Sequence, residues 1–417
     1  MKKHTSYIFT AVFFSILIST VSVASVKHMS GSNGDIDSVG LMESISAADE
    51  ILPIEANSEY VLNSDMDLKG KTYTLPEGVT IKGAGGLFRN GTLVGNRTKV
   101  TASSAVFDNV RIQGSWNVPE ISTDLFADLD YDNSLRDVFM LADSSVENKI
   151  VVKPGVYNVR ASSNKAAINV AGNTTVYLEG EIRLRANKHQ AYSVMQVKDA
   201  VNVLIKGAGK IIGDKDIHTG EEGEWGHGVN ILNSSNVRIY GITVENCWGD
   251  CIYVGKKSED VVIADCSLSR GRRQGISVTC ADGVLICDCI ISEISGTMPQ
   301  HGIDIEPNKG EMVDNVTISN VKVFNSYGGI MTWAPKSAWI GRVSIKNCHV
   351  DKVKVSSPMS FLRTESVTIQ NCSISSNSNN CISAKELGKL VVKGNVLKCK
   401  GKQPVITSDV KESEIGG

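Results

Sequence analysis

The segment Val261-Val262-Ile263-Ala264-Asp265-Cys266-Ser267-Leu268 contains most of one turn of the repeat that decides the fold of this chain. Two positions after its apolar triplet stands Asp265, a residue type that tolerates left-handed backbone geometry, and a cysteine and a second short strand follow. The next turn repeats this order in Val284-Leu285-Ile286-Cys287-Asp288-Cys289-Ile290-Ile291. A chain that turns the same corner at intervals is typical of a solenoid.

Nine copies of the apolar triplet occur along the chain. They begin at Val176, Val203, Val237, Val261, Val284, Val316, Val343, Val367 and Leu390. Their spacing ranges from 23 residues (261 to 284) to 34 residues (203 to 237). Short strands with turns and no helix predict rungs that stack at about 4.8 Å. We therefore predict an all-β fold, a right-handed parallel β-helix, and the right hand follows from the strong bias of parallel crossovers.

The corner of each repeat is also marked by residue type. Two positions after the triplets stand Gly180, Gly207, Gly241, Asp265, Asp288, Asn320, Asn347, Asn371 and Gly394. Four of the ten cysteines follow such a corner directly, namely Cys266, Cys289, Cys348 and Cys372. Export would favour disulfides, but one small apolar side chain per rung suits a core position inside the coil. We expect these thiols to be reduced and buried.

The two ends of the chain differ from the repeat. Residues 1–24 resemble a secretory signal, with Lys2 and Lys3 before an apolar run and small residues Ser22 and Ala24 before the cut. We assign residues 25–57 to a linker or irregular segment, 58–149 to irregular first rungs and a cap, 150–400 to regular rungs and 401–417 to a tail. The cap is predicted to include a short helix between Asn133 and Ala142.

Composition limits the partners and the compartment. The net charge is -2, which indicates no basic surface for nucleic acid. No apolar run after the signal is long enough to span a bilayer. We expect a secreted or periplasmic monomer without a membrane span.

The stretch Gln300-His301-Gly302-Ile303-Asp304-Ile305-Glu306-Pro307 carries the candidate chemistry. Side chains alternate between the two faces of a strand, so Asp304 and Glu306 share the face opposite Ile303 and Ile305. Their Cα atoms would lie roughly 6.6 Å apart. Two carboxylates at that spacing can act on one bond or hold one ion.

Stacking predicts which residues surround Asp304. An outward column seven residues before most triplets contains Asn169, Gln196, Asn230, Tyr253, Ser277, Asp304, Met331, Ser360 and Ser383. Charged and aromatic residues gather within about two rungs, or roughly 10 Å, of Asp304. Insertions at 214–226, 292–300 and 334–340, with Trp225, Trp333 and Trp339, would turn this face into a groove with aromatic walls that suits sugar rings.

These observations define a candidate site. We predict that the catalytic residues are Asp304, Glu306 and Asp250. We predict that the substrate is contacted by Arg272, Arg273, His301, His227, Tyr253, Trp333 and Trp225. The alternative is a structural ion-pair network formed by the two acids, the histidine and the arginines, Arg270 included.

The chain resembles the pectate-lyase-like superfamily of right-handed β-helices, which includes polygalacturonase-type glycoside hydrolases and polysaccharide lyases. The resemblance lies in Ile150–Tyr157, Gly249-Asp250-Cys251, Arg272–Ile276 and His301–Asn308. It implies a complex carbohydrate as the substrate. The polygalacturonase motifs Asn-Thr-Asp, Asp-Asp, Gly-His-Gly and Arg-Ile-Lys do not occur in that order, because Gly226-His227-Gly228 precedes Gly249-Asp250 and no Arg-Ile-Lys is present. The catalytic residues of that family are therefore not carried over.

Three functions remain open from the sequence. Inverting hydrolysis needs a carboxylic acid and a carboxylate base about 6.5–9.5 Å apart; we assign Glu306 as the acid and Asp304, expected nearer the arginines, as the base, with no cofactor. β-Elimination on a uronate would use Arg273 or His301 as the base, with Ca²⁺ held by Asp304, Glu306 and Asn308. The third function is a β-helix that binds a glycan without turnover.

Overall fold

The computed structural model describes residues 54–129 and 134–416. The predicted signal peptide and most of the predicted linker lie outside the described residues. The sheets below belong to one compact unit that begins at Asp49.

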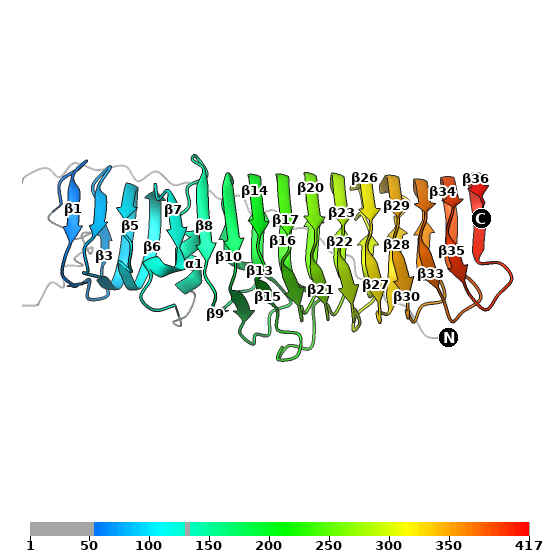
Figure 1. Cartoon of the computed structure of the whole chain (residues 1–417), viewed down its shortest axis with the longest axis horizontal. Coiled ribbons are helices and arrows are strands. Elements are labelled where there is room, and N and C mark those ends of the chain that lie inside the picture. The colour runs from blue at the N-terminus through cyan, green and yellow to red at the C-terminus, as the bar shows by residue number, and fades with distance from the viewer. Residues whose placement is uncertain (1–53, 130–133, 417) are drawn as a thin grey trace, which may run out of the picture. The chain divides into compact units, whose positions relative to one another are not determined.

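Each regular rung consists of three short strands, and the rungs follow one another from β8 to β36 (Figure 1). The first strands are β10 (Ala166–Val170), β13 (Ala191–Lys198), β16 (Trp225–Leu232), β19 (Ile252–Gly255), β22 (Ile276–Val278), β25 (His301–Ile305), β28 (Gly328–Trp333) and β31 (Met359–Leu362). The second strands are β8 (Asn148–Val152), β11 (Thr174–Leu178), β14 (Val201–Lys206), β17 (Ser235–Tyr240), β20 (Ser258–Ala264), β23 (Ala281–Cys287), β26 (Met312–Ser319), β29 (Trp339–Lys346) and β32 (Thr364–Gln370). The third strands are β9 (Val156–Val159), β12 (Glu181–Leu184), β15 (Lys210–Ile212), β18 (Thr243–Glu245), β21 (Ser267–Ser269), β24 (Ile290–Ser292), β27 (Lys322–Phe324), β30 (His349–Asp351), β33 (Ser373–Ser375) and β35 (Val396–Lys398).

The sheets confirm the predicted parallel β-helix. The first and second strands form a 20-stranded sheet, and the third strands form a 10-stranded sheet. Every pairing between successive rungs is parallel, as in Ser277 with Asp304 and Asp304 with Met331. The predicted outward column is in register from Asn169 to Ser383. The first triplet is out of register with the second by two residues, because Val176 pairs with Ile205 rather than with Val203.

The predicted corners have the expected backbone. Asp265, Asp288, Asn320, Asn347 and Asn371 have φ angles between 54° and 56°. At an earlier corner, the side chain of Asn236 donates to Asn202 (2.8 Å), and Asn202 donates to Asn173 (2.9 Å). Side-chain bonds between neighbouring rungs thus support a backbone conformation that asparagine tolerates better than most residues do.

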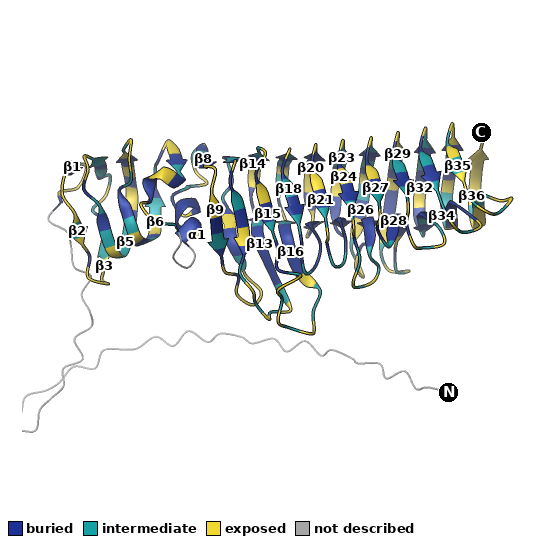
Figure 2. Cartoon of the chain, turned by 60° about the horizontal axis from the view of Figure 1, so that its bottom comes forward, coloured by how far each residue is buried: buried dark blue, intermediate teal, exposed yellow. Residues whose placement is uncertain are grey.

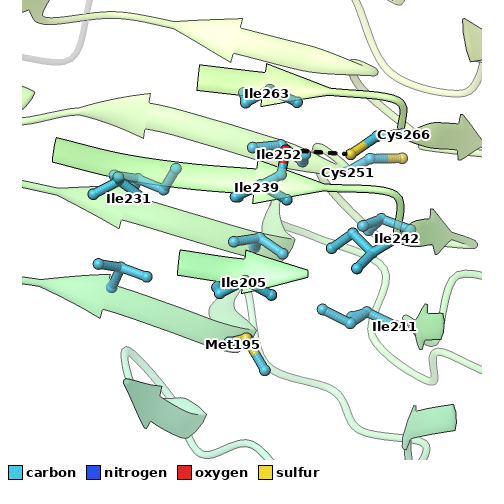
Figure 3. Close-up of a cluster of buried hydrophobic side chains, with 14 of the residues drawn as sticks. Met195, Ile205, Ile211, Ile231, Ile239, Ile242, Cys251, Ile252, Ile263 and Cys266 are labelled. Carbon is cyan, nitrogen blue, oxygen red and sulfur yellow. Dashed lines mark hydrogen bonds between the residues drawn. The ribbon is translucent and has the colours of Figure 1, made fainter. Parts of the chain in front are cut away.

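The core consists of inward side chains that stack on their equivalents in the next rung. Ile205, Ile239 and Ile263 form one such column (Figure 3). In Figure 2 the inward positions are dark blue and the exposed positions gather at corners and loops. The thiol of Cys266 lies in this core and donates to the carbonyl oxygen of Ile239 (3.9 Å) (Figure 3). All four corner cysteines are free and buried, as predicted.

The N-terminal rungs are less regular. They contain β1 (Glu59–Leu62), β2 (Met66–Asp67), β3 (Thr72–Thr74), β4 (Thr80–Gly83), β5 (Phe88–Thr101), β6 (Phe107–Trp116), β7 (Glu120–Ser122) and the 3-10 helix η1 (Thr123–Leu125). The predicted helix is α1 (Ser134–Phe139), which packs against β6, β9 and β10. Buried Asp137 fixes it to β6 by accepting from Arg111 (2.9 Å) and from the backbone N–H of Ile112 (3.1 Å).

The last rung extends further than expected. Residues 401–417, which we assigned to a tail, contain β36 (Val405–Ile415), and this strand pairs with β34 (Ile382–Lys393) along its length. Most of its side chains are exposed (Figure 2). The sequence of this strand does not alternate between apolar and polar residues as the earlier rungs do, which is why we did not predict it. In the described part of the chain, no helix is long and apolar enough to cross a membrane.

The inward column of thiols is testable. We expect Cys266, Cys289, Cys348 and Cys372 to resist iodoacetamide in the native protein and to react after unfolding, because they are at most 2% exposed. Cys399, which is partly exposed, should react first and serves as the internal control. Peptide mass spectrometry measures both. Native labelling of the four at the rate of Cys399, or disulfides between them, would contradict the arrangement.

Candidate active site

Three neighbouring rungs bring most of the predicted catalytic residues together. Asp250 directly precedes the rung of β19, Arg273 and Gln274 precede β22, and Asp304 lies in β25 with Glu306 just after it. In-register stacking places these positions on one face of the coil. The groups come from sequence positions more than 50 residues apart (250 to 306).

Asp304 is completely buried although it points away from the coil core. Its Oδ2 accepts from Nε2 of Gln274 (2.7 Å), whereas its Oδ1 has no partner that donates to it. Burial raises the pKa of Asp304 well above its usual value, and the neighbouring carboxylate of Glu306 raises it further. Both effects favour the uncharged form of the Asp304 carboxyl, against the opposing effect of Arg273.

Arg273 links the remaining acids. Its side chain is 13% exposed. Nη1 lies 3.1 Å from Oδ2 of Asp250, Nη2 lies 3.3 Å from Oε2 of Glu306, and Nε lies 3.9 Å from Oε1 of Glu224. Burial raises the pKa of Asp250 to about 6, against the opposing effect of Arg273. Three carboxylates thus share one guanidinium.

These environments are the reverse of those we expected for Asp304 and Glu306. Arg273 contacts Glu306, whose side chain is 27% exposed, whereas Asp304 is buried and has Gln274 as its hydrogen-bond partner. The Oε1 of Gln274 also accepts from the backbone N–H of His301 (2.6 Å). Arg273 therefore acts on Asp304 through its charge, without a hydrogen bond, and the assignment of Asp304 as the base stays a prediction.

Both predicted histidines are neutral and have defined ring orientations. Burial lowers the pKa of His301 to about 4, and its Nδ1 donates to the carbonyl oxygen of Pro299 (2.8 Å), which leaves Nε2 without a proton. The ring of His301 requires a glycine at 328, because a Cβ there would lie 2.4 Å from Nε2.

The second histidine, His227, lies beside Asp250. Burial lowers its pKa to about 3, and its Nδ1 accepts from the backbone N–H of Asp250 (3.3 Å). Its ring stacks on Tyr253 at 4.8 Å, and the Tyr253 hydroxyl bonds to Thr279 (2.8 Å). These contacts connect the acid cluster to the next rungs.

Other predicted substrate contacts lie outside the acid cluster. The guanidinium of Arg272 stacks on Trp248 at 3.8 Å and donates to the carbonyl oxygen of Gly223 (2.7 Å). Trp333, which is 38% exposed, follows Glu306 by one rung. Trp225 is 49% exposed and lines a cavity of about 250 Å³ together with His227 and Asn230.

A buried network that the sequence did not reveal anchors the long loop between β15 and β16, which extends out of the stack (Figure 1). Asp214 accepts from Tyr192 (2.5 Å), Asn187 (2.8 Å) and Nδ1 of His218 (2.8 Å). The ring of His218 stacks on Trp248 at 3.9 Å. The loop is thereby held in place, and Glu224 near its end reaches Arg273. The sequence repeat does not predict the conformation of an insertion. The sequence therefore shows that extra residues are present here, but not how they fold.

Within the described ranges, no group of three or more histidine, cysteine, aspartate or glutamate side chains is arranged to hold a metal ion. The candidate site combines one buried acid with a raised pKa, carboxylates around an arginine, and two buried histidines with lowered pKa values.

Comparisons with known proteins define the class of this chain. A family model described as "Right handed beta helix region" matches residues 176–342. The chain has the right-handed parallel β-helix fold. A solved structure with this fold is the A-module of a mannuronan C-5 epimerase from Azotobacter vinelandii (TM-score 0.51, 13% identity, covering 68% of this chain and 76% of the module).

Two proteins of Bacillus subtilis are similar in sequence. The SPbeta prophage-derived uncharacterized protein YorA is 29% identical over 52% of this chain, and the uncharacterized protein YclG is 33% identical over 39% of it. The matched parts span only 41% and 31% of the lengths of these relatives.

The role of Arg273 can be separated from that of an ordinary surface arginine. Arg273→Ala should lower the free energy of unfolding by about 3–5 kcal/mol, because it leaves buried carboxylates without their counter-charge. Arg183→Ala, at a position 49% exposed, is the control and should change stability little. Chemical denaturation measures both. Equal effects would show that Arg273 does not hold the acids.

The proton on Asp304 predicts a pH-dependent stability difference. The folded protein keeps this proton to higher pH than the unfolded chain does, so stability is lost as the pH rises through the raised pKa. Asp304→Asn can donate to Glu306 without a titrating proton, so its Tm relative to the wild type should increase from pH 4 to pH 7. Asp409→Asn on exposed β36 is the control. A difference in Tm that does not change with pH would show that Asp304 is ionised.

Proposed function

We propose that this protein is a carbohydrate-active enzyme that hydrolyses glycosidic bonds. The observation that carries the proposal is the buried Asp304 carboxyl, whose pKa is raised by burial and by the neighbouring carboxylate of Glu306, while the partly exposed Glu306 contacts Arg273. A carboxylic acid that keeps its proton near neutral pH is the group that glycoside hydrolysis needs to protonate the leaving oxygen.

Glu306 is the member of the pair that meets the substrate. Asp250 and Asp304 are fully buried, whereas the side chain of Glu306 is 27% exposed. The proton moves from Asp304 to the carboxylate of Glu306, which passes it to the glycosidic oxygen as the bond between that oxygen and the sugar carbon breaks. Arg273 stabilises the two carboxylates that remain. Asp304 is then a positioning and proton-donating residue behind the catalytic acid.

Asp250 is the candidate base for the attacking water. It lies across the guanidinium of Arg273 from Glu306, which keeps the two carboxylates apart. With a pKa raised by burial to about 6, it is ionised at neutral pH. Asp250 is itself buried, so the water must reach it past its neighbour His227, which lines the cavity of about 250 Å³. A base and an acid on separate sides of the bond correspond to inversion.

The contacts of the arginines favour hydrolysis over elimination. A lyase must neutralise a uronate carboxylate, but Arg273 is shared among three acids and Arg272 lies on Trp248. The mannuronan epimerase module shares only the fold, so the carbohydrate class rests on this site's own acids and exposed tryptophans. We further propose that the enzyme acts outside the cytoplasm, on the basis of its N-terminal sequence.

Product analysis tests the reaction. The purified protein is incubated with a panel of plant, algal and host glycans, and new reducing ends are measured together with ultraviolet absorbance. Reducing ends without absorbance support hydrolysis. Absorbance of an unsaturated uronate means elimination, and neither product from any glycan means a binding protein.

The acid pair predicts the effect of one substitution on turnover. Asp304→Asn should lower kcat by about 10² or more, the usual loss when an acid–base group is removed, while the fold is retained. Ser360→Ala, in the same outward column, is the control and should keep near-normal turnover. Turnover of the Asp304→Asn protein within a few-fold of the wild type would remove Asp304 from the mechanism.

A further inference from the structure

A second pocket lies at the corner between the first and second strands of four successive rungs. Its volume is about 640 Å³. It arises because residues 306–311 form a long connection, while the neighbouring rungs turn within residues 256–257 and 279–280. The pocket is lined by Lys256, Lys257, Ser258, Glu259, Cys280, Ala281, Asp282, Gly310, Glu311, Met312, Asp314 and Trp339.

The wall of this pocket combines an aromatic ring with a carboxylate. Trp339 is 40% exposed and lies one rung beyond Met312, which is 61% exposed. The position of the ring depends on Gly341, because a Cβ there would lie 2.4 Å from Cη2 of Trp339 and 2.2 Å from Oδ1 of Asp314. The glycine therefore lets the indole ring lie beside Asp314, as a flat apolar surface next to a hydrogen-bond acceptor.

The carboxylates of the pocket form a second column. Glu259, Asp282 and Asp314 are in register on successive rungs, at the strand repeat of about 4.8 Å. Asp314 is held in place by the backbone N–H of Arg342 (2.8 Å) and by its Nη2 (2.9 Å). Carboxylate oxygens at this spacing can accept from hydroxyl groups along a chain of sugar units.

Two lysines face these acceptors. Lys256 and Lys257 have φ angles of 57° and 64°, and no other adjacent pair of non-glycine residues in the described ranges has positive φ. Most other positions with this geometry are Asn or Asp, the residue types that adopt it at lower cost. Neither lysine has an ion pair with another described residue, so both ammonium groups can donate to a ligand.

We infer that this corner pocket binds one uncharged sugar unit of a glycan chain. The Trp339 ring stacks on the apolar face of the sugar, Asp282 and Asp314 accept from its hydroxyls, and the two lysines donate to it. The lysines are balanced by the four carboxylates that line the pocket, those of Glu259, Asp282, Glu311 and Asp314, so the pocket has no excess positive charge that would favour a uronate. The ligand class rests on the proposed function, but the pocket is separate from the acid pair.

Retardation in native affinity gels tests this inference. The gels contain hydroxyethylcellulose, arabinoxylan, galactomannan or polygalacturonate. We expect at least one neutral polysaccharide to retard the wild type, and Trp339→Ala to bind that polysaccharide about tenfold more weakly through loss of the stacking surface. Trp339→Phe should keep most of the retardation. The double variant Lys256→Met and Lys257→Met should weaken it, whereas Lys69→Met, a lysine elsewhere with φ of 54°, should not.

The outcomes separate this inference from the proposed function. Retardation that Trp339→Ala keeps, retardation by polygalacturonate alone, or no retardation of the wild type overturns the inference. Glycan hydrolysis without retardation leaves the proposed function and removes the second site. Retardation that depends on Trp339, without any product, leaves the second site and removes the proposed enzyme activity. Thermal melting of each variant shows that the fold is intact.

Discussion

In-register parallel stacking is the constraint on which the rest of this structure depends. Each residue lies about 4.8 Å from its equivalents in the neighbouring rungs, so every position becomes a column. Inward columns of isoleucine and valine stabilise the fold, because each apolar side chain is buried against a similar side chain in the next rung. Outward columns of charged residues would repel, unless each carboxylate is protonated or shares a cation.

The acid cluster solves this problem in two ways at once. The raised pKa of Asp304 favours its uncharged form, and Asp250, Glu224 and Glu306 share Arg273. The two arrangements come from adjacent residues, because Arg273 contacts Glu306 and Gln274 donates to Asp304. The same interactions that make the cluster tolerable in the folded state therefore prepare a proton donor beside stabilised carboxylates. A structural network and an active site are not exclusive descriptions of these residues.

The columns could be predicted because the period is regular. The register from Asn169 to Ser383 follows from counting back from the triplets, and the corners from Asp265 to Asn371 follow from residue type. Burial could not be predicted in the same way. Asp304 points outward, which predicts an accessible base, but its side chain is completely buried. Likewise Glu224 and the Asp214 network come from an insertion whose path no periodicity determines.

Insertions also explain why the candidate site lies in rungs that depart from the regular repeat. The face of a regular rung is open to water, and an exposed carboxyl there keeps an ordinary pKa. A raised pKa needs desolvation, and only longer connections can cover that face. The anchored loop before β16 contributes Glu224 and the carbonyl oxygen of Gly223, while Gly310 and Glu311, in the long connection after β25, line the corner pocket. The solenoid supplies the spacing of the acids, and its irregular connections supply the environment in which one of them holds a proton.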